Sequence, residues 1–222
     1  MTLHVPIVQH QSVNGLIDKT DLQFDIVKIQ QNIDSILKLC RVGRFRAFET
    51  PTRMWALNLN HPPNPEQYDP GNPDCKFIGT LSGNETAVAK LGLTGDDFTE
   101  MSNIVANSYL GHVYRTVTEW HNQNNSHLGA INRIYVAFMA DGAGYQLHKD
   151  PHTGCKYHIP VWSNPYSYMI VEDAMQLKSV SMPADGCVWK LDTNVMHTAL
   201  NLIPRIATRE DRIRAHIIIH AS

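Results

Sequence analysis

The chain has 222 residues, of which 43% are hydrophobic and 18% are charged. This length and composition predict a single domain, residues 1–222, with one sizeable core. The formal net charge is −2, which excludes the strongly basic surface on which binding to nucleic acids or to anionic membranes usually depends.

The four cysteines are widely spaced and form no C-x-x-C pair: Cys40, Cys75, Cys155 and Cys187. This spacing predicts neither a zinc ribbon nor a disulfide framework, and reduced thiols are typical of a cytosolic protein. The first fifteen residues lack a basic start followed by an apolar core, and no apolar run approaches the length of a membrane span. We therefore expect a cytoplasmic protein that is not exported and has no membrane partner.

The N-terminal part, residues 1–128, is predicted to be helical and rich in loops. In residues 21–39, isoleucine and leucine recur at three-and-four spacing, which predicts an amphipathic helix with Thr20 or Asp21 at its start. The same spacing predicts a second, longer helix over residues 94–120.

Between these two helices, the sequence changes character twice. Residues 45–60 favour short strands. Residues 60–85 are rich in Pro, Gly and Asn, and a long segment of this kind is either disordered or functional. A lid on the substrate side is the interpretation that we favour.

After Gly129, short runs of strand-forming residues alternate with turn signals. Six to eight strands in fewer than a hundred residues predict a barrel or jelly roll. Residues 129–222 are therefore expected to form a mainly β, cupin-like core, with the N-terminal helices packed on its outside.

The densest group of potential metal ligands lies in HKDPHTGCKYHIP, residues 148–160. If residues 145–150 form a strand, alternation places His148 and Asp150 on the same face. His197, near the start of a later strand, can supply a third ligand. Two histidines and one carboxylate form the facial arrangement that leaves open positions on a non-haem Fe(II), where a bidentate co-substrate and dioxygen could bind.

Five segments in this order resemble the aspartyl/asparaginyl β-hydroxylase-like and proline-hydroxylase-like 2-oxoglutarate oxygenases: GAGYQLHKDPH, KYHIPV, DGCVWKLD, MHTALN and RAHIII. The resemblance covers roughly 90 residues, from about Ala130 to the C-terminus. It implies a double-stranded β-helix with iron held by His148, Asp150 and His197. It also implies that the protein hydroxylates an unactivated C–H of an amino-acid side chain, consuming 2-oxoglutarate and O2 and releasing succinate and CO2.

The same resemblance implies how 2-oxoglutarate is held. The family anchors its distal carboxylate with an arginine in an R-x-H motif, which falls here on Arg214 and His216. A guanidinium suits this task because it donates two parallel hydrogen bonds to one carboxylate. Arg212 competes with Arg214, because in a strand both would face the same way. Where the family usually carries arginine and histidine, this chain has Lys156 and His158, which we expect to contact the co-substrate.

Some nearby residues are expected to have no functional role. The segment between Asn201 and Arg214 is longer than the usual turn of the family, and its Arg205 and Arg209 are interpreted as solvated surface residues. His152 is expected to lie in a loop, since flanking proline and glycine disfavour a helix. The thiol of Cys155 is expected to be buried and inert.

Two alternatives stay open. A cupin-like enzyme that uses a divalent metal for hydrolysis or isomerisation would keep the three ligands but would have no need for Arg214. A non-catalytic binding module would retain the ligands for structure alone. For the oxygenase, the expected partner is a free amino acid or a peptide or protein substrate, with no nucleic acid. The sequence predicts neither the substrate nor the oligomeric state.

Overall fold

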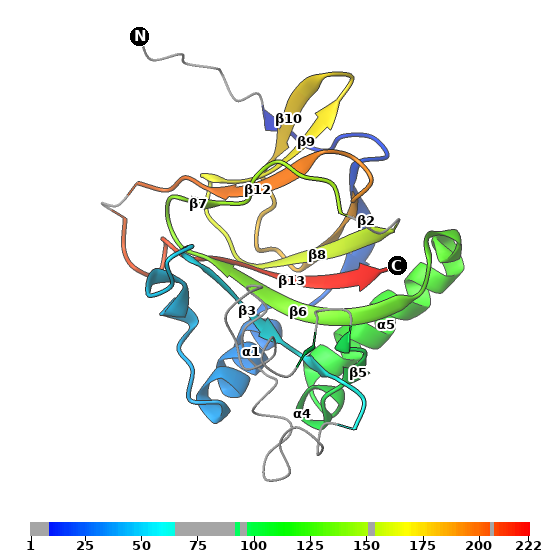
Figure 1. Cartoon of the computed structure of the whole chain (residues 1–222), viewed down its shortest axis with the longest axis vertical. Helices are drawn as coiled ribbons and strands as arrows, with labels where there is room; N and C mark the ends of the chain where they lie inside the picture. The colour runs from blue at the N-terminus through cyan, green and yellow to red at the C-terminus, as the bar shows by residue number, and fades with distance from the viewer. Residues whose placement is uncertain (1–8, 65–91, 94–96, 151–153, 205–206) are drawn as a thin grey trace.

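A computed structural model describes residues 9–64, 92–93, 97–150, 154–204 and 207–222. Two β-sheets face each other, and helices cover the outer side of the larger sheet (Figure 1). Most of the expected 60–85 lid, together with Cys75, His152 and Arg205, lies outside the described residues. The predictions for these positions stay predictions.

The N-terminal part contains the following elements: β1 (Gln9–His10), β2 (Ile17–Gln23), α1 (Ile26–Leu39), the 3-10 helix η1 (Arg44–Phe48), β3 (Met54–Asn58), β4 (Asn60–His61), β5 (Glu100–Met101), α4 (Asn103–Ala106), α5 (Tyr109–Asn124) and η4 (Ser126–Leu128). The described residues of the C-terminal part form eight strands: β6 (Ile131–Met139), β7 (Ala143–Gly144), β8 (Cys155–Trp162), β9 (Ser167–Asp173), β10 (Gln176–Val180), β11 (Cys187–Asp192), β12 (His197–Asn201) and β13 (Arg214–Ala221).

The eight C-terminal strands are divided equally between the two facing sheets. Strands β6, β8, β11 and β13 belong to the six-stranded sheet, whose order is β2-β11-β8-β13-β6-β3. Strands β7, β9, β10 and β12 belong to the five-stranded sheet, whose order is β1-β10-β9-β12-β7. This is the connectivity of a double-stranded β-helix, so the predicted mainly β jelly roll is confirmed.

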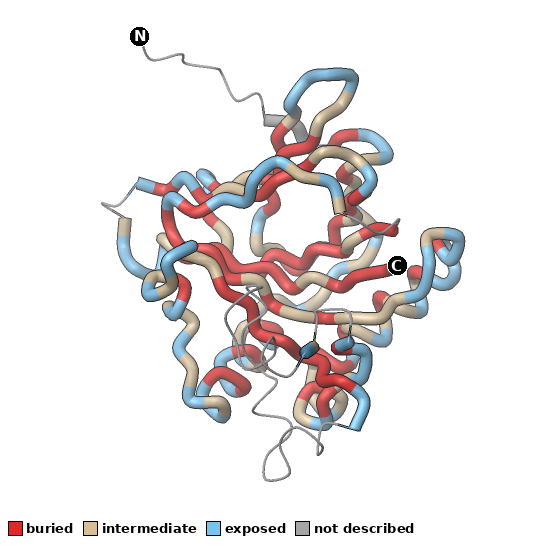
Figure 2. The backbone as a smooth tube through the Cα atoms, viewed as in Figure 1, coloured by how far each residue is buried: buried red, intermediate tan, exposed pale blue. Residues whose placement is uncertain are grey.

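The larger sheet is buried on both faces. Its outer face packs against α1 and α5 through a cluster that includes Ile33, Val113 and Phe138. Its inner face meets the smaller sheet in a second cluster around Val171 and Leu191. Figure 2 shows that most of β8 and β13 is buried, whereas the tip of the β9–β10 hairpin is exposed. Apolar burial of this kind is the main stabilising contribution to the fold.

The first predicted helix is correct in type but begins too early. Residues Ile17–Gln23 form β2, an edge strand of the larger sheet that pairs with β11. The helix begins at Ile26, because the Asp25 carboxylate accepts hydrogen bonds from the amides of Val27 and Lys28, at 3.1 Å each. Leu22 fits both a strand period and a helix period, which explains why spacing alone extended the helix.

The second predicted helix is divided in the structure. Its expected first turns contain β5 and the short helix α4, and the long helix α5 begins only at Tyr109. Ser108 caps α5 by accepting a hydrogen bond from the amide of Leu110 at 3.1 Å, and Asn32 on α1 accepts one from the amide of Tyr109 at 2.8 Å. These two side chains stabilise the break, which the apolar spacing does not reveal.

The N-terminal part also contributes more than a helical cover. Strands β2 and β3 are the two edges of the larger sheet, so this part extends the jelly roll on both sides. Among the described residues, no helix is both long and apolar enough to cross a membrane.

Candidate functional site

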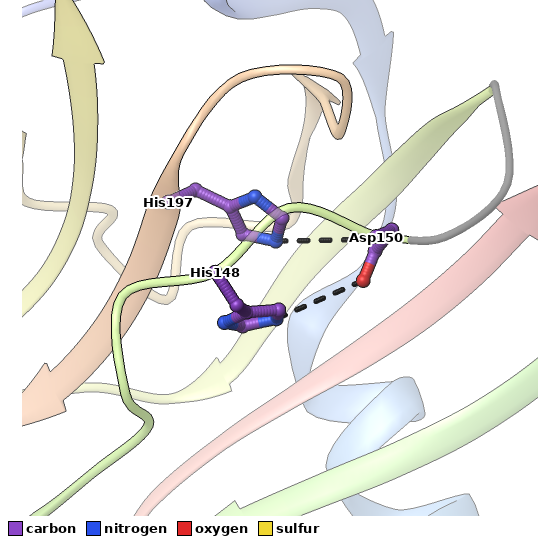
Figure 3. A group of neighbouring side chains, drawn as sticks. All are labelled: His148, Asp150 and His197. Carbon is purple, nitrogen blue, oxygen red and sulfur yellow. Dashed lines mark ion pairs between the residues drawn. The ribbon is translucent and has the colours of Figure 1, made fainter.

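His148, Asp150 and His197 lie together at the inner side of the smaller sheet (Figure 3). One ligand atom from each residue can be chosen so that all three lie within 4.8 Å of one another. Nε2 of His148 is 3.7 Å from Oδ1 of Asp150, and Nε2 of His197 is 3.9 Å from Oδ2. Both imidazoles therefore turn Nε2 toward the carboxylate, so the three donor groups converge on a point where a metal ion could bind.

The backbone that carries His148 is not the continuous strand that was predicted for residues 145–150. Strand β7 ends at Gly144, and His148 then pairs with His197 in an isolated bridge. In this bridge each residue's amide donates to the other's carbonyl, at 3.1 and 2.8 Å, and the amide of Asp150 donates to the carbonyl of Thr193 at 3.2 Å. Backbone pairing with β12 and with the turn before it thus places His148 and Asp150. Strand alternation does not account for their positions.

Backbone carbonyls orient the two imidazoles. Nδ1 of His148 lies 2.7 Å from the carbonyl of Gln146, and Nδ1 of His197 lies 2.9 Å from that of Val195. When Nδ1–H donates to these carbonyls, Nε2 keeps the lone pair that a metal needs. Burial lowers the pKa of His197 below its ordinary value, which favours the neutral ligating form. The three residues therefore fit a divalent metal ion.

Lys156 on β8 makes an ion pair with the third ligand. Its Nζ is 2.6 Å from Oδ2 of Asp150, and the two side chains are only 17% and 12% exposed. Burial alone would raise the pKa of Asp150, but the charge of Lys156 and the bond to it outweigh burial and lower that pKa. Asp150 is therefore a carboxylate at neutral pH. The sequence predicted Lys156 near the site but did not indicate this partner.

A cavity of about 150 Å³ between the sheets adjoins His148 and His197. Six of the seven predicted site residues line it, and the seventh, Asp150, lies against Lys156. The lining residues are Tyr135, Ala137, Phe138, Met139, Tyr145, His148, Lys156, His158, Met169, Leu191, His197, Ala199, Arg214, His216 and Ile218. None of these described lining residues is acidic.

One wall of the cavity is a group of buried nitrogen atoms from Arg214, His158 and His216. Arg214 is 5% exposed, and its Nη2 is 3.5 Å from Nδ1 of His216. Among the described residues, the Nε of Arg214, both ring nitrogens of His158 and Nε2 of His216 have no hydrogen-bond partner. Buried polar groups without protein partners are rare, so these nitrogens are available to a bound ligand or water.

Burial also determines the charges of this wall. It lowers the pKa of Arg214 to about 10, so the guanidinium stays charged at neutral pH. It lowers the pKa of His158 and His216 well below the ordinary value, and the nearby charge of Arg214 acts in the same direction. The wall is therefore one cation flanked by two neutral imidazoles, which suits a single carboxylate.

The structure distinguishes Arg214 from Arg212. Strand β13 begins at Arg214, so Arg212 lies before the strand, and the expected alternation between them does not apply. The guanidinium of Arg212 instead donates to the buried carboxylate of Asp141 at 2.9 Å, and Arg53 binds the same oxygen at 2.5 Å. Arg212 is already paired, and it does not line the cavity. The exposed Arg209 lies over Phe45, with its guanidinium carbon 4.8 Å from the ring centre.

Two tyrosines of the cavity were missed from the sequence. Tyr135 lies on β6, where alternation with the lining residues Ala137 and Met139 could have indicated it. Tyr145 lies just after β7, and the residue as a whole is 45% exposed. Burial of its hydroxyl end, with a smaller effect of Tyr135, raises the pKa of Tyr145 to about 12. Tyr145 therefore lines the cavity with a neutral phenol.

Fold and site together define a double-stranded β-helix with a candidate metal site of two histidines and one carboxylate. No protein-family model matches the chain, and no curated protein is similar to it in sequence. Similar solved structures include a prolyl-4-hydroxylase from Pseudomonas putida, with 12% identity and a TM-score of 0.43 over 94% of this chain and 93% of that chain. A 2OG-Fe(II) oxygenase family oxidoreductase from Burkholderia pseudomallei has 12% identity and a TM-score of 0.38 over 55% of this chain and 60% of that chain.

A third similar structure belongs to the capsular polysaccharide assembling protein CapF from Staphylococcus aureus, with 14% identity and a TM-score of 0.33 over 40% of this chain. The chain covers 22% of the Staphylococcus protein and 60% of the Burkholderia protein, less than two thirds of either. At such identities and TM-scores, these likenesses carry no argument about function.

Proposed function

We propose that the protein is a non-haem Fe(II)- and 2-oxoglutarate-dependent oxygenase. It hydroxylates an unactivated C–H of an amino-acid side chain, either in a peptide or protein or in a free amino acid such as proline. One observation carries the proposal. The three-ligand metal site shares a small cavity with Arg214, a buried cation that has no carboxylate partner among the described residues.

The chain's own residues have distinct tasks in this proposal. His148, Asp150 and His197 would hold Fe(II), whose preferred donors include imidazole and carboxylate. The bound iron, together with O2 and 2-oxoglutarate, would supply the oxidation itself. Arg214 binds the distal carboxylate of 2-oxoglutarate, and the two neutral histidines beside it can donate further hydrogen bonds.

Arg214 also separates this proposal from the alternatives. A cupin-like hydrolase or isomerase would use the same three ligands, and a structural site would usually complete a fourth position with protein. Neither would need a buried arginine facing the cavity, and a buried charge without a partner destabilises the folded state. We further propose a cytoplasmic location and a substrate that is an amino acid or a peptide.

The experiment is anaerobic absorbance spectroscopy with Fe(II), before and after addition of 2-oxoglutarate. A visible charge-transfer band is expected in the wild type and is expected to be absent in His197→Ala and Arg214→Ala. Arg212→Met is the matched control, because Arg212 is only two residues from Arg214 but its guanidinium is bound to Asp141. It is expected to keep the band.

Iron loading must be confirmed for each variant by metal analysis. If iron-loaded wild-type protein gives no band with 2-oxoglutarate, the oxygenase proposal is wrong and the metal-dependent cupin becomes the leading hypothesis. If the band appears, succinate release in the presence of candidate amino acids and peptides identifies the substrate.

A further inference from the structure

The cavity is too small to enclose a co-substrate and an amino acid together. It measures about 150 Å³, and a cavity of about 150 Å³ in another protein holds one molecule of benzene. Pockets that enclose larger ligands measure roughly 300–1,000 Å³. Because 2-oxoglutarate is larger than benzene, the cavity that holds it has no space left to enclose a second ligand.

The charges of the cavity also disfavour a free amino acid. Such a substrate carries an α-ammonium, which needs an anionic partner when it is taken out of water. No described residue that lines the cavity is acidic, and Asp150 beside it is already paired with Lys156. A residue within a peptide has no such ammonium, and only its side chain would have to enter.

An exposed edge of the smaller sheet lies beside the metal ligands. Strand β7 is the last in the order of this sheet, and the bridge between His148 and His197 continues the edge to the first ligand. Residues 144–147 are all exposed. Figure 3 shows that the same segment of chain then carries His148 and Asp150. The edge is therefore an accessible strand that ends at the metal site.

The backbone of this edge is able to pair with a further strand. The amide of Tyr145 donates to the carbonyl of Ala199 on β12 at 3.1 Å. In an antiparallel ladder, the backbone groups of the alternate residues Gly144 and Gln146 then point away from β12. Within the described part of the chain, the amide of Gln146 donates no hydrogen bond. Sheet edges with unpaired groups are templates to which extended peptides bind.

Two partly exposed side chains accompany the edge. Tyr145 is 45% exposed although it lines the cavity, and its ring centre is 6.2 Å from that of His148. Leu147 is 39% exposed. A strand added here would lie about 4.8 Å from the segment that carries His148. One of its side chains could then pass Tyr145 toward the metal ligands.

We propose that the substrate is an extended segment of a peptide or protein, which pairs as a strand with residues 144–147 and directs one side chain to the metal site. Backbone hydrogen bonds to the edge supply affinity, and Tyr145 and Leu147 contact side chains of the segment. The inference rests on the proposed function, because it selects between the peptide and the free amino acid that this function leaves open.

The first test measures succinate release by the iron-loaded protein in the presence of 2-oxoglutarate and O2. One probe is a mixture of free amino acids. The other is a set of peptide pools, each with one fixed central residue and with both ends capped. The peptides have about eight residues, more than a typical strand of about 5–6. Pools are suitable because backbone pairing tolerates many sequences. We expect a several-fold increase in succinate with at least one peptide pool and none with free amino acids.

The second test scans backbone N-methylation through a peptide from the active pool. A methyl group on an amide that points to the edge removes a hydrogen bond and prevents close approach. Successive amides of a strand point in opposite directions. The KM of the peptide should therefore rise about tenfold at every second position around the reacting residue and change little at the positions between.

A pair of protein variants locates the edge. Leu147→Ala is expected to raise the KM of the peptide about three- to tenfold, because it removes apolar contact area. Leu177→Ala is the matched control, since Leu177 is also an exposed leucine of the smaller sheet but lies on β10, away from β7. It should keep the wild-type KM. The charge-transfer band with 2-oxoglutarate verifies the co-substrate site in both variants.

Failure of this inference and failure of the proposed function have different signatures. If the band forms but only free amino acids, or neither probe, increase succinate release, the peptide substrate is wrong and the co-substrate site stands. N-methylation effects that do not alternate, or a wild-type KM in Leu147→Ala, overturn pairing at this edge. If iron-loaded protein gives no band with 2-oxoglutarate, the proposed function fails and this inference fails with it.

Discussion

Replacing Arg214 by methionine is expected to make the protein more stable while it abolishes 2-oxoglutarate binding. The side chain is 5% exposed, it has no carboxylate partner among the described residues, and its Nε has no hydrogen-bond partner there. A buried cation of this kind is retained at the expense of stability. Methionine has a similar length and no charge, and it can fill the space without polar atoms.

The magnitude follows from the effect of burial on the guanidinium. Burial lowers the pKa of Arg214 from an ordinary 12.5 to about 10. Each pH unit of lowering corresponds to about 1.4 kcal/mol. The charged form therefore destabilises the folded state by about 3 kcal/mol, and this penalty is fully present below the folded-state pKa, hence at pH 7. After subtracting lost packing contacts, we expect a net gain of roughly 1–2 kcal/mol, which raises Tm by about 2–8 °C for a chain of this size.

The assay is a thermal melt of metal-free protein at pH 7, paired with calorimetry of 2-oxoglutarate binding. Arg212→Met is the matched control with the opposite expected result. It removes one of the two arginines that bind the buried carboxylate of Asp141 and leaves Arg53 at 2.5 Å, so Tm should fall by an amount equivalent to roughly 1–3 kcal/mol while binding is retained. A lower Tm for Arg214→Met, or retained binding, would refute the assignment of the two arginines.

Three further results are expected. His197→Ala should abolish the rise of Tm that divalent metal causes in the wild type, measured by thermal melts with and without Mn(II). Burial lowers the pKa of His216, so on acidification the unfolded chain takes up a proton at this residue first, below about pH 6.5. His216→Leu should therefore reduce the loss of folding stability between about pH 7 and pH 5. An unchanged pH profile of stability contradicts this. Gly186→Ala should destabilise the fold by at least about 2 kcal/mol in urea melts, because Gly186 has φ +81° and an added Cβ would lie 2.0 Å from the carbonyl oxygen of Phe24.

The jelly roll could be predicted because its strands are short apolar runs separated by turn residues, a pattern typical of a barrel or jelly roll. One such run, residues 131–140, forms β6 (Ile131–Met139). The helices were less predictable. Leu22 satisfied a helical spacing but belongs to β2, and the break before Tyr109 depends on Asn32, which is distant in sequence.

The convergence of the three candidate ligands could be predicted, but for a partly mistaken reason. His148 and Asp150 converge, but through backbone pairing with His197 and Thr193 and not through strand alternation. Residue type and spacing were sufficient because a metal site requires particular donors, and few histidines and carboxylates occur in that order. The partner of Lys156 could not be predicted, because an ion pair depends on which strands lie side by side.

Arg212 and Arg214 show most clearly what spacing leaves open. Both are arginines two residues apart, and strand alternation alone favours neither, although only Arg214 lies in the R-x-H motif with His216. The distinction comes from Asp141, which lies after β6 and takes up Arg212 together with Arg53. Asp141 neutralises Arg212 and leaves Arg214 buried without a carboxylate partner among the described residues. Arg212 therefore has a structural role, and Arg214 is available to bind a ligand. In the proposed function, the choice of Arg214 as the carboxylate-binding residue thus depends as much on the placement of Asp141 as on Arg214 itself.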